Sequence, residues 1–484
     1  MSPAEFDVLV LGGGAAGATL AGELSRLSPD LSIAIVEAGP SDRHPFVRMP
    51  FGLVALMGSR RDWAFRSAPQ AALGGRRVAI PRGRMLGGSA SINSMVWFRG
   101  RADDFDHWGP GWGRDDVMPA FDAVESAMRP APIADPHPLS AALAGVHPGP
   151  PTPERVSAGP FICNLERGRR RSPVDAFLKG ARVTVLTGRV VDRLTVSDGR
   201  ATGVILADGT RIAARAGVVL SAGAIGSPTL LLRSGIGPGG AVADLPAVGA
   251  NLHDHPAIAV HHEGRGSGRG LTLAQLPGWA VAPLRWAWRG TGPLASNTVE
   301  AGAFLSTDGA SRPDVQVHFI PARLGHAGRA IGWGAGYYAD VCVMQPRSRG
   351  RLTLDGAGQP VIDLELLTDD RDRATLRAGL RALRRLLAAA PFGTRRAPEV
   401  FPATGDDDAA LDAHIDARAG TAYHPVGTCA IGAVTDAALA VRGVDGLWVA
   451  DASVMPRITS ANTNAPSIMI GYRAARMVAQ ALRG

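Results

Sequence analysis

The first forty residues constrain the fold more than any other stretch of this sequence. An apolar run at residues 6–11 is typical of a buried parallel strand and leads directly into Gly12-Gly13-Gly14-Ala15-Ala16-Gly17, a G-x-G-x-x-G sequence. An Ala- and Leu-rich segment at residues 18–27 predicts a helix, and residues 31–36 predict a second strand that ends at Glu37. Strand, glycine turn, helix, strand and acid follow in the order that predicts a dinucleotide-binding βαβ unit.

Each part of this unit has a physical reason. Gly12 permits the tight turn, Gly14 lets a pyrophosphate approach the backbone, and Gly17 lets the helix pack closely on the strand. The unpaired amides at the start of the helix bind the pyrophosphate. Glu37 stands 20 residues after Gly17, where a carboxylate can accept hydrogen bonds from an adenosine ribose. The pattern does not distinguish a nicotinamide from a flavin dinucleotide.

Composition sets the outer bounds on function. The 484 residues are enough for two domains, and 51 basic against 43 acidic residues give a net charge of +8. The densest basic run, at residues 167–171, has no interleaved aromatic residues. We therefore expect it to be a solvated surface and expect no nucleic-acid partner.

Cysteine usage and hydropathy exclude further classes. Cys163, Cys342 and Cys429 are far apart and form no CxxC pair, which argues against a disulfide framework or a structural zinc. No run of about 18 apolar residues predicts a membrane span. The first strand begins near residue 6, which leaves no room for a signal peptide, so we expect a cytoplasmic protein. His253-Asp254-His255 lacks a third ligand cluster, and we expect a structural role at a domain junction and no metal site.

A second glycine-rich segment carries the resemblance to a family. The pair Gly87-Gly88, followed by small residues, lets the backbone lie against a flat ligand. The stretch from Gly83 to Trp97 resembles the first signature of the glucose–methanol–choline (GMC) oxidoreductases, which are flavin alcohol oxidases and dehydrogenases. The stretch from Ala224 to Gly237 resembles their second signature. Ile92 stands where some members carry a histidine bonded to the flavin, so the resemblance implies FAD held non-covalently.

The resemblance also implies which residues contact FAD. Val191 would lie against the adenine and Asp451 would contact the ribityl chain, while the start of the last helix would face the flavin pyrimidine with its positive end. The complete set of expected cofactor residues is Gly12, Gly14, Ala15, Ala16, Gly17, Glu37, Ala38, Arg84, Gly87, Gly88, Ser89, Asn93, Ser94, Met95, Val96, Val191, Ala222, Gly223, Asp451, Ala452, Asn462 and Thr463.

Two residues near the carboxyl end are the catalytic candidates. His424 is followed by Pro425, which disfavours a helix at the histidine. A histidine on such a loop can point into a cleft with its pKa near the working pH, and by resemblance it is the family's active-site base. Asn462 has the chemistry of a helix cap before the last helix, and by resemblance it is the second catalytic residue.

The resemblance spans almost the whole chain and implies an α/β fold with two domains. A Rossmann-like FAD-binding domain would comprise residues 1–130, 181–255 and 415–484. A substrate domain on an antiparallel sheet would comprise residues 131–180 and 256–414. From the residues themselves, we expect 44–61 to be a loop or lid and 129–153 a connecting segment. We expect helices from Ser227-Pro228 and over 371–390.

The expected activity is oxidation of a primary alcohol to an aldehyde, with O2 or a quinone- or dye-type acceptor reoxidising the flavin. The aromatic residues of the substrate block favour an aryl or furanic alcohol. No acidic cluster suited to a quaternary ammonium was found, which disfavours a choline-type dehydrogenase without excluding it. A lyase of the same fold, acting on cyanohydrins or decarboxylating fatty acids under light, stays open. A nicotinamide-dependent reductase is the weaker alternative, since only one dinucleotide fingerprint is present. The sequence does not predict the oligomeric state.

Overall fold

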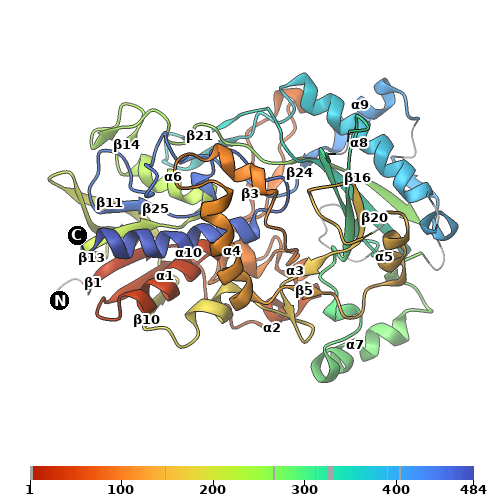
Figure 1. The fold of residues 1–484 in the computed structure, drawn as a ribbon, viewed down its shortest axis with the longest axis horizontal. Helices are drawn as coiled ribbons and strands as arrows, with labels where there is room; N and C mark the ends of the chain where they lie inside the picture. Colours follow the sequence, from red (N-terminus) through yellow and green to blue (C-terminus); the bar gives the residue numbers. More distant parts are fainter. Residues whose placement is uncertain are drawn as a thin grey trace.

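The computed structural model describes residues 4–147, 149–264, 267–310, 312–324, 332–389, 391–402 and 405–483. Two β-sheets lie next to each other along the long axis of the molecule, each with helices packed on it (Figure 1). The chain passes between them several times, so neither sheet is built from one continuous segment.

The first sheet is the dinucleotide-binding sheet predicted from the glycine turn. Its order is β10-β2-β1-β13-β12-β11, with β25 beside β13. The strand β13 is shared, since its first half pairs antiparallel with β12 and its last three residues pair parallel with β25. The strands are β1 (Ala4–Leu11), β2 (Ile33–Glu37), β10 (Val183–Thr187), β11 (Val191–Ser197), β12 (Arg200–Leu206), β13 (Arg211–Leu220) and β25 (Leu447–Val449).

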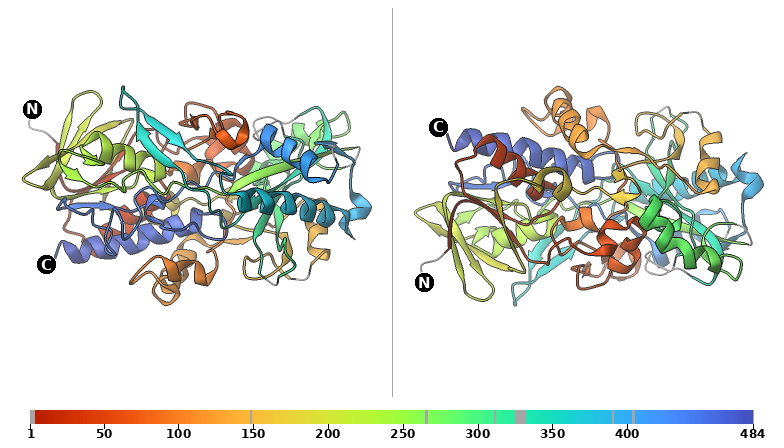
Figure 2. Two further views of the ribbon diagram at one scale, coloured as in Figure 1. Left: turned by 90° about the horizontal axis from the view of Figure 1, so that it is seen from above. Right: turned by 90° about the horizontal axis from the view of Figure 1, so that it is seen from below.

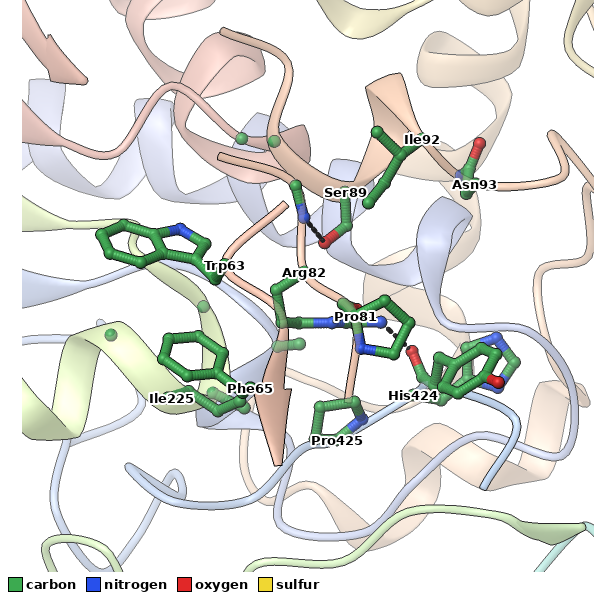
Figure 3. Close-up of a pocket in the computed structure, with 18 of the residues that line it drawn as sticks. Trp63, Phe65, Pro81, Arg82, Ser89, Ile92, Asn93, Ile225, His424 and Pro425 are labelled. Carbon is green, nitrogen blue, oxygen red and sulfur yellow. Dashed lines mark hydrogen bonds between the residues drawn. The ribbon is translucent and has the colours of Figure 1, made fainter. Parts of the chain in front are cut away.

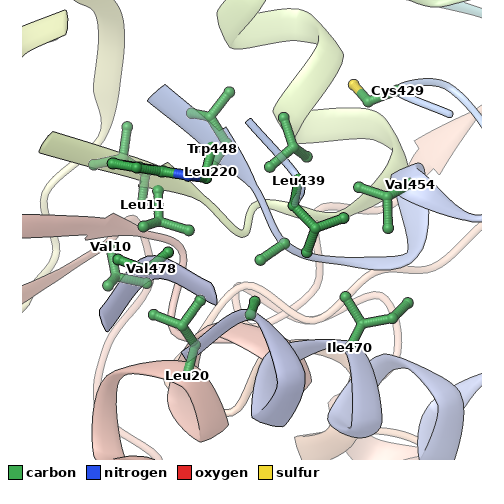
Figure 4. Close-up of a cluster of buried hydrophobic side chains, with 14 of the residues drawn as sticks. Val10, Leu11, Leu20, Leu220, Cys429, Leu439, Trp448, Val454, Ile470 and Val478 are labelled. Carbon is green, nitrogen blue, oxygen red and sulfur yellow. The ribbon is translucent and has the colours of Figure 1, made fainter. Parts of the chain in front are cut away.

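The helices α1 (Ala15–Leu27) and α10 (Asn464–Ala481) cross closely against this sheet. A Cβ added at Gly471 of α10 would lie 2.3 Å from the carbonyl oxygen of Ala16, so only a glycine permits the observed distance. Between helices and sheet lies an apolar core that includes Val10, Leu20 and Ile470 (Figure 4). The first and last parts of the chain are thereby fixed against each other.

The second sheet is antiparallel, as the resemblance implied. Its order is β23-β16-β20-β19-β18-β6, with β17 beside β20 and β24 beside β16. The helix α8 (Asp370–Ala388) packs on it, and Gly379 lets the helix approach Val341 of β20 closely. The strands are β6 (Ser157–Pro160), β16 (Pro256–Glu263), β17 (Gly270–Leu271), β18 (Ala301–Leu305), β19 (Val315–Ile320), β20 (Gly334–Val343), β23 (Glu399–Phe401) and β24 (Gly420–Thr421).

Short elements connect the two sheets. The helices among them are α2 (Pro45–Arg48), η1 (Pro50–Gly52), α3 (Leu53–Leu56), η2 (Ala71–Leu73), η3 (Gly88–Ser91), η4 (Ala102–His107), α4 (Arg114–Met128), α5 (Pro138–Ala142), η5 (Leu143–Gly145), η6 (Val174–Leu178), α6 (Gly223–Arg233), α7 (Leu276–Arg289), η7 (Pro293–Ala295), η9 (Phe392–Arg395), α9 (Asp408–Arg418) and η10 (Ala452–Val454). The remaining strands are β3 (Phe65–Arg66), β4 (Ala79–Ile80), β5 (Ala131–Pro132), β7 (Ile162–Cys163), β8 (Leu165–Glu166), β9 (Arg169–Arg170), β14 (Ile236–Gly237), β15 (Ala243–Asp244), β21 (Arg351–Leu354) and β22 (Pro360–Asp363).

Several local predictions were wrong. Residues 44–61 form short helical turns with Val47, Leu53 and Leu56 buried, because apolar side chains recur in that segment. The helix expected to start at Ser227-Pro228 starts at Gly223 instead, so Pro228 lies inside it. The segment expected as a connection contains α5, whose Leu139 is buried.

The division into domains stays our proposal. The strand membership of the two sheets supports boundaries near residues 130, 180, 255 and 414, although β24 (Gly420–Thr421) lies just beyond the last boundary and pairs with β16. None of the helices in the described residues is long and apolar enough to cross a membrane.

Candidate active site

A cavity of about 1120 Å³ runs from the glycine turn after β1 to His424 at the second sheet (Figure 3). Residues from both sheets line it, among them Leu11 of β1 and His318 of β19, together with Gly14, Asn93 and Asn462 from loops. The cavity is therefore long enough to hold a dinucleotide and to leave room for a second molecule beside His424.

The three glycines of the fingerprint have distinct surroundings. A Cβ at Gly12 would lie 2.6 Å from the Ser221 carbonyl oxygen, and one at Gly17 would lie 2.0 Å from the Gly12 carbonyl oxygen. At Gly14 the nearest heavy atom would be 3.9 Å away, because this position faces the cavity. Gly12 and Gly17 thus permit packing of the protein on itself, while Gly14 leaves space for a ligand at the start of α1.

Two buried carboxylates stand at strand ends beside this turn. Glu37 accepts hydrogen bonds from the backbone amides of Gly13 and Gly39, at 2.9 and 2.8 Å, so it also braces the turn. Asp451 accepts hydrogen bonds from the Gly223 amide (2.9 Å) and the Ser227 hydroxyl (2.6 Å). Burial raises the pKa of both carboxyls. Both residues line the cavity, and their contacts to ribose and ribityl groups stay a prediction.

The second glycine segment forms a bend held by an arginine that the sequence did not single out. Arg170 is 2% exposed, and its guanidinium donates to the carbonyl oxygens of Val47, Ala90 and Asn93 and to Oδ1 of Asn93. Burial lowers its pKa to about 9. The expectation of a solvated arginine run was wrong at this position, because Arg170 satisfies the carbonyl groups of a bend that lines the cavity.

Most predicted cofactor residues line this one cavity. Gly17, Arg84 and Gly87 are not among the lining residues, since Gly17 packs on Gly12, Arg84 lies over the Trp63 ring (4.9 Å), and the Gly87 amide donates to Gly13. Those that line it are Gly12, Gly14, Ala15, Ala16, Glu37, Ala38, Gly88, Ser89, Asn93, Ser94, Met95, Val96, Val191, Ala222, Gly223, Asp451, Ala452, Asn462 and Thr463.

The peptide group that joins Tyr423 to His424 is held at both its N–H and its C=O. The His424 amide donates to Oδ1 of Asp254 at 2.8 Å, and the Arg82 guanidinium donates to the Tyr423 carbonyl oxygen. Tyr423 has φ of +66°, a left-handed conformation that few non-glycine residues adopt. Such a conformation persists where surrounding contacts fix it, and here those contacts fix the direction of the His424 ring.

The side chain of His255 and the backbone carbonyl group of Thr459 together define which nitrogen of His424 carries the proton. His255 Nε2 lies 3.0 Å from the Thr459 carbonyl oxygen, which can only accept, so this nitrogen carries the proton. Burial lowers the pKa of His255 to about 4, which leaves the ring neutral and makes its Nδ1 an acceptor. His424 Nδ1 lies 3.0 Å from that nitrogen and therefore donates to it.

The other nitrogen of His424 is consequently free to accept a proton. Burial, together with the positive charge of the nearby Arg82, lowers the pKa of His424 well below its usual value, so the ring is neutral and Nε2 has a lone pair. We expected a pKa near the working pH, whereas the buried position depresses it. A neutral imidazole with an oriented lone pair is a competent general base.

Asn462 connects this base to the second sheet. Its Nδ2 lies 3.2 Å from His424 Nε2 and 3.3 Å from His318 Nε2, while its Oδ1 accepts from Gln316 Nε2 at 3.0 Å. The helix α10 begins at Asn464 with Thr463 at the capping position, so Asn462 does not act as a cap. The carboxamide instead presents two N–H donors to two imidazoles.

His318 is a candidate site residue that sequence analysis missed. Its Nδ1 lies 2.8 Å from Oδ1 of Asp340, and both side chains line the cavity. A histidine and an aspartate 22 residues apart give no local signal. Only the pairing of β19 with β20, which places His318 opposite Asp340, brings them together.

The metal alternative finds no support in the part of the chain that the structure describes, where no group of three potential ligands is present. His253 donates to the Asn251 carbonyl oxygen and accepts from the Ile458 amide, at 2.6 and 3.0 Å. His253 therefore has the expected structural role, whereas His255 contacts the candidate base directly.

The fold and the cavity together define a chain of two large sheets with a cavity that reaches from the glycine turn after β1 to the neutral imidazole of His424. Two sequence models of GMC oxidoreductases match residues 6–257 and 346–471. Curated relatives include an oxygen-dependent choline dehydrogenase of Rhizobium johnstonii, 35% identical over 97% of this chain and 95% of the relative. Another is an alcohol dehydrogenase [acceptor] of Pseudomonas putida, 33% identical over 98% and 95%.

The solved structures agree in fold. A pyridoxine 4-oxidase from Mesorbium loti superposes with a TM-score of 0.85 at 28% identity, over 97% of this chain and 98% of that one. A fungal aryl-alcohol oxidase superposes with a TM-score of 0.80 at 20% identity, over 99% of both chains, which shows the shared fold alone.

This chain belongs to the GMC oxidoreductase family. It is an FAD-dependent oxidoreductase that acts on CH–OH donors. The residues present fit the cofactor, since the cavity is open at Gly14, where a dinucleotide pyrophosphate would need space at a helix start.

Proposed function

We propose that this enzyme oxidises a primary alcohol to the aldehyde, with His424 as the base and Asn462 as the residue that holds the alcohol oxygen. The observation that carries the proposal is the contact of His424 Nε2 with Asn462 Nδ2 at 3.2 Å, inside the cavity. A lone pair and an N–H donor side by side match the two demands of an alcohol group, which donates its proton and accepts at its oxygen.

The proposed roles follow from this geometry. The substrate hydroxyl donates to His424 Nε2, and its oxygen takes over one of the two N–H donors of Asn462. Bound FAD supplies the acceptor for the hydride from the carbinol carbon. Proton transfer to a positioned base contributes about 10²- to 10⁴-fold in rate, and the Gln316 contact keeps the Asn462 carboxamide in the required orientation.

We infer that FAD is held non-covalently. Ile92 is 5% exposed and lies in an apolar cluster with Val47, Leu56 and Met85. Its hydrocarbon side chain has no nucleophilic atom that could bond to a flavin. The experiment is acid precipitation of the holoenzyme, which should release all yellow colour into the supernatant; colour that stays with the protein would contradict it.

We propose an aromatic or furanic alcohol as the substrate. Tyr338 and Tyr423 contribute to the cavity wall near His424, and His261 stacks on Tyr338 with ring centroids 5.2 Å apart. Flat apolar surfaces of this kind favour a planar substrate. The similar solved structure is named as a pyridoxine 4-oxidase, and pyridoxine is an alcohol on an aromatic ring, which supports this choice.

A cationic alcohol of the choline type is the second candidate, and one observation favours it. Asp340 places a carboxylate on the cavity wall beside His318 and near Tyr338, and a carboxylate with an aromatic ring is suited to a quaternary ammonium. Relatives named choline dehydrogenase are 35% identical. Sequence analysis did not single out this carboxylate, because one aspartate in a strand has no distinctive pattern.

A substrate panel distinguishes these candidates. Benzylic, furanic, pyridine-type, aliphatic and choline alcohols are mixed anaerobically with the holoenzyme, and loss of flavin colour is recorded. Fast bleaching by an aryl or furanic alcohol supports the first candidate. Preference for choline that is lost in Asp340→Asn supports the second. Absence of bleaching with every alcohol contradicts alcohol oxidation and favours a lyase.

Peroxide release in air, compared with dye reduction, tests whether O2 or a quinone-like molecule is the acceptor.

A further inference from the structure

The helix α7 (Leu276–Arg289) has an apolar outer face. Leu284 is 75% exposed and Trp288 is 87% exposed, and Leu273, just before the helix, is 85% exposed. The positions 276, 280, 284, 287 and 288 fall on one side of a helix with about 100° per residue. Trp279, Ala282 and Trp286 point the other way and pack on the protein. Figures 1 and 2 show α7 at the edge of the molecule.

A helix that is apolar on both faces is normally covered on both faces. Several large apolar side chains that are exposed together on one surface mark an interaction site. Trp333, 66% exposed, extends the same region, because it forms a β-bridge with Leu271, two residues before Leu273. We call this surface the α7 face, and it comprises Leu273, Leu276, Val281, Leu284, Trp288 and Trp333.

Basic side chains predominate on the helix that carries the α7 face. The helix contains Arg285 and Arg289 and no acidic residue. Arg285 and Arg289 flank the apolar stripe, with Arg289 over the Trp288 ring at 5.7 Å, and Arg169 lies over Trp286 at 4.5 Å. The exception nearby is Asp135, which pairs with Arg285 at 3.1 Å. The surface therefore complements a negatively charged partner.

We propose that the α7 face binds the surface of an anionic lipid bilayer. Leucine and tryptophan on one side of a helix with flanking arginines are the features of a helix that lies in a membrane interface, and tryptophan prefers that depth. Lipid phosphates attract the same arginines.

The helix α7 lies near the active-site cavity, so a bilayer bound to α7 would also lie near the cavity. Trp279 on its inner side contacts Phe51, with ring centroids 5.6 Å apart, and Leu53 and Met57, a few residues further on, line the active-site cavity. A bound bilayer would thus lie beside one wall of the cavity. The lipid contact does not depend on which alcohol the cavity accepts.

The test is co-sedimentation of the FAD-loaded enzyme with lipid vesicles. We expect the enzyme to bind vesicles that contain phosphatidylglycerol. Its binding to vesicles of pure phosphatidylcholine should be weaker by roughly tenfold or more, and high salt should weaken the binding to the anionic vesicles. The double variant Leu284→Glu/Trp288→Glu should lose roughly tenfold or more of this binding. Because both side chains are exposed, its thermal unfolding temperature should stay near that of the wild type.

The matched control is Val242→Glu, which alters an apolar residue 42% exposed near the other sheet and should bind as the wild type does. Equal binding by the double variant and the wild type, or no binding of the wild type to anionic vesicles, would overturn the proposal. Sedimentation velocity tests the remaining alternative, which is self-association of the enzyme through the α7 face. A dimer that the double variant dissociates would assign the face to self-association and overturn the lipid proposal.

Discussion

His424 and His255 face each other through their Nδ1 atoms at 3.0 Å, and this contact leaves His424 Nε2 as the basic nitrogen. The Thr459 carbonyl oxygen sets the direction of this hydrogen bond, because it requires the proton on His255 Nε2 and so leaves His255 Nδ1 as the acceptor. His255 thus selects the tautomer of the candidate base without lining the part of the cavity where substrate would bind.

His255→Phe should slow flavin reduction by alcohol about tenfold or more while FAD remains bound, because His424 Nδ1–H loses its acceptor and the ring loses its orientation. The measurement is the limiting rate of anaerobic flavin bleaching. The control is His262→Phe, another buried imidazole that bonds a carbonyl oxygen, that of Ala397, away from the cavity. If both substitutions slow flavin reduction equally, His255 contributes only packing, and its assigned role in orienting His424 is contradicted.

Gly14→Ala should weaken FAD binding, whereas Gly17→Ala should destabilise the fold. The new methyl at position 14 lies in open cavity, so we expect FAD affinity to fall about tenfold or more with little change in the unfolding temperature of the apoprotein. The new methyl at position 17 lies 2.0 Å from the Gly12 carbonyl oxygen and should cost about 1–3 kcal/mol of stability. FAD titration and urea unfolding measure the two effects. An unchanged FAD affinity in Gly14→Ala would contradict the assigned pyrophosphate site.

The limiting rate of flavin reduction should not show a His424 ionisation near neutrality. Because the pKa of His424 lies well below 6.5, the base stays unprotonated as the pH is lowered from about 8.5 to 6.5. Burial raises the pKa of Asp254, which accepts from the His424 amide, to about 7, so any weak dependence near pH 7 should vanish in Asp254→Asn. A rate that falls below an apparent pKa of 7 in both proteins would contradict the assigned state of His424.

Arg170→Met should destabilise the protein by roughly 2–4 kcal/mol, because buried carbonyl oxygens of Val47, Ala90 and Asn93 lose their donors. Urea unfolding of the apoprotein measures this loss. Arg167→Met, an exposed neighbour in the same basic run, should change stability by less than about 0.5 kcal/mol. Similar small values for both variants would show that the bend around Asn93 does not need the buried arginine.

The sequence predicted the parts of this fold that depend on local pattern. The strand β1, the glycine turn, α1 and β2 are contiguous, and each has a chemical signature that a single segment carries. The helix α8 was predicted for the same reason, since its apolar positions recur with helical spacing. His424 and Asn462 were found through resemblance, because a histidine before proline and an asparagine before a helix have ordinary structural explanations.

The rest of the candidate site depends on contacts between distant segments. His255, Gln316 and His318 reach Asn462 and His424 only because β16 and β19 of the second sheet border the cavity. The depressed pKa of His424 likewise comes from burial by several elements, which a loop sequence does not reveal. Arg170 was assigned to a solvated run, since burial of one arginine among five residues leaves no trace in composition.

The most direct test of the catalytic proposal is anaerobic stopped-flow mixing of His424→Ala holoenzyme with the alcohol that bleaches the wild type fastest. Loss of the base should slow flavin bleaching by about 10²- to 10⁴-fold, while the absorbance spectrum shows that FAD is still bound. Bleaching of the variant at a rate close to that of the wild type would remove His424 from the reaction and contradict the account of this site.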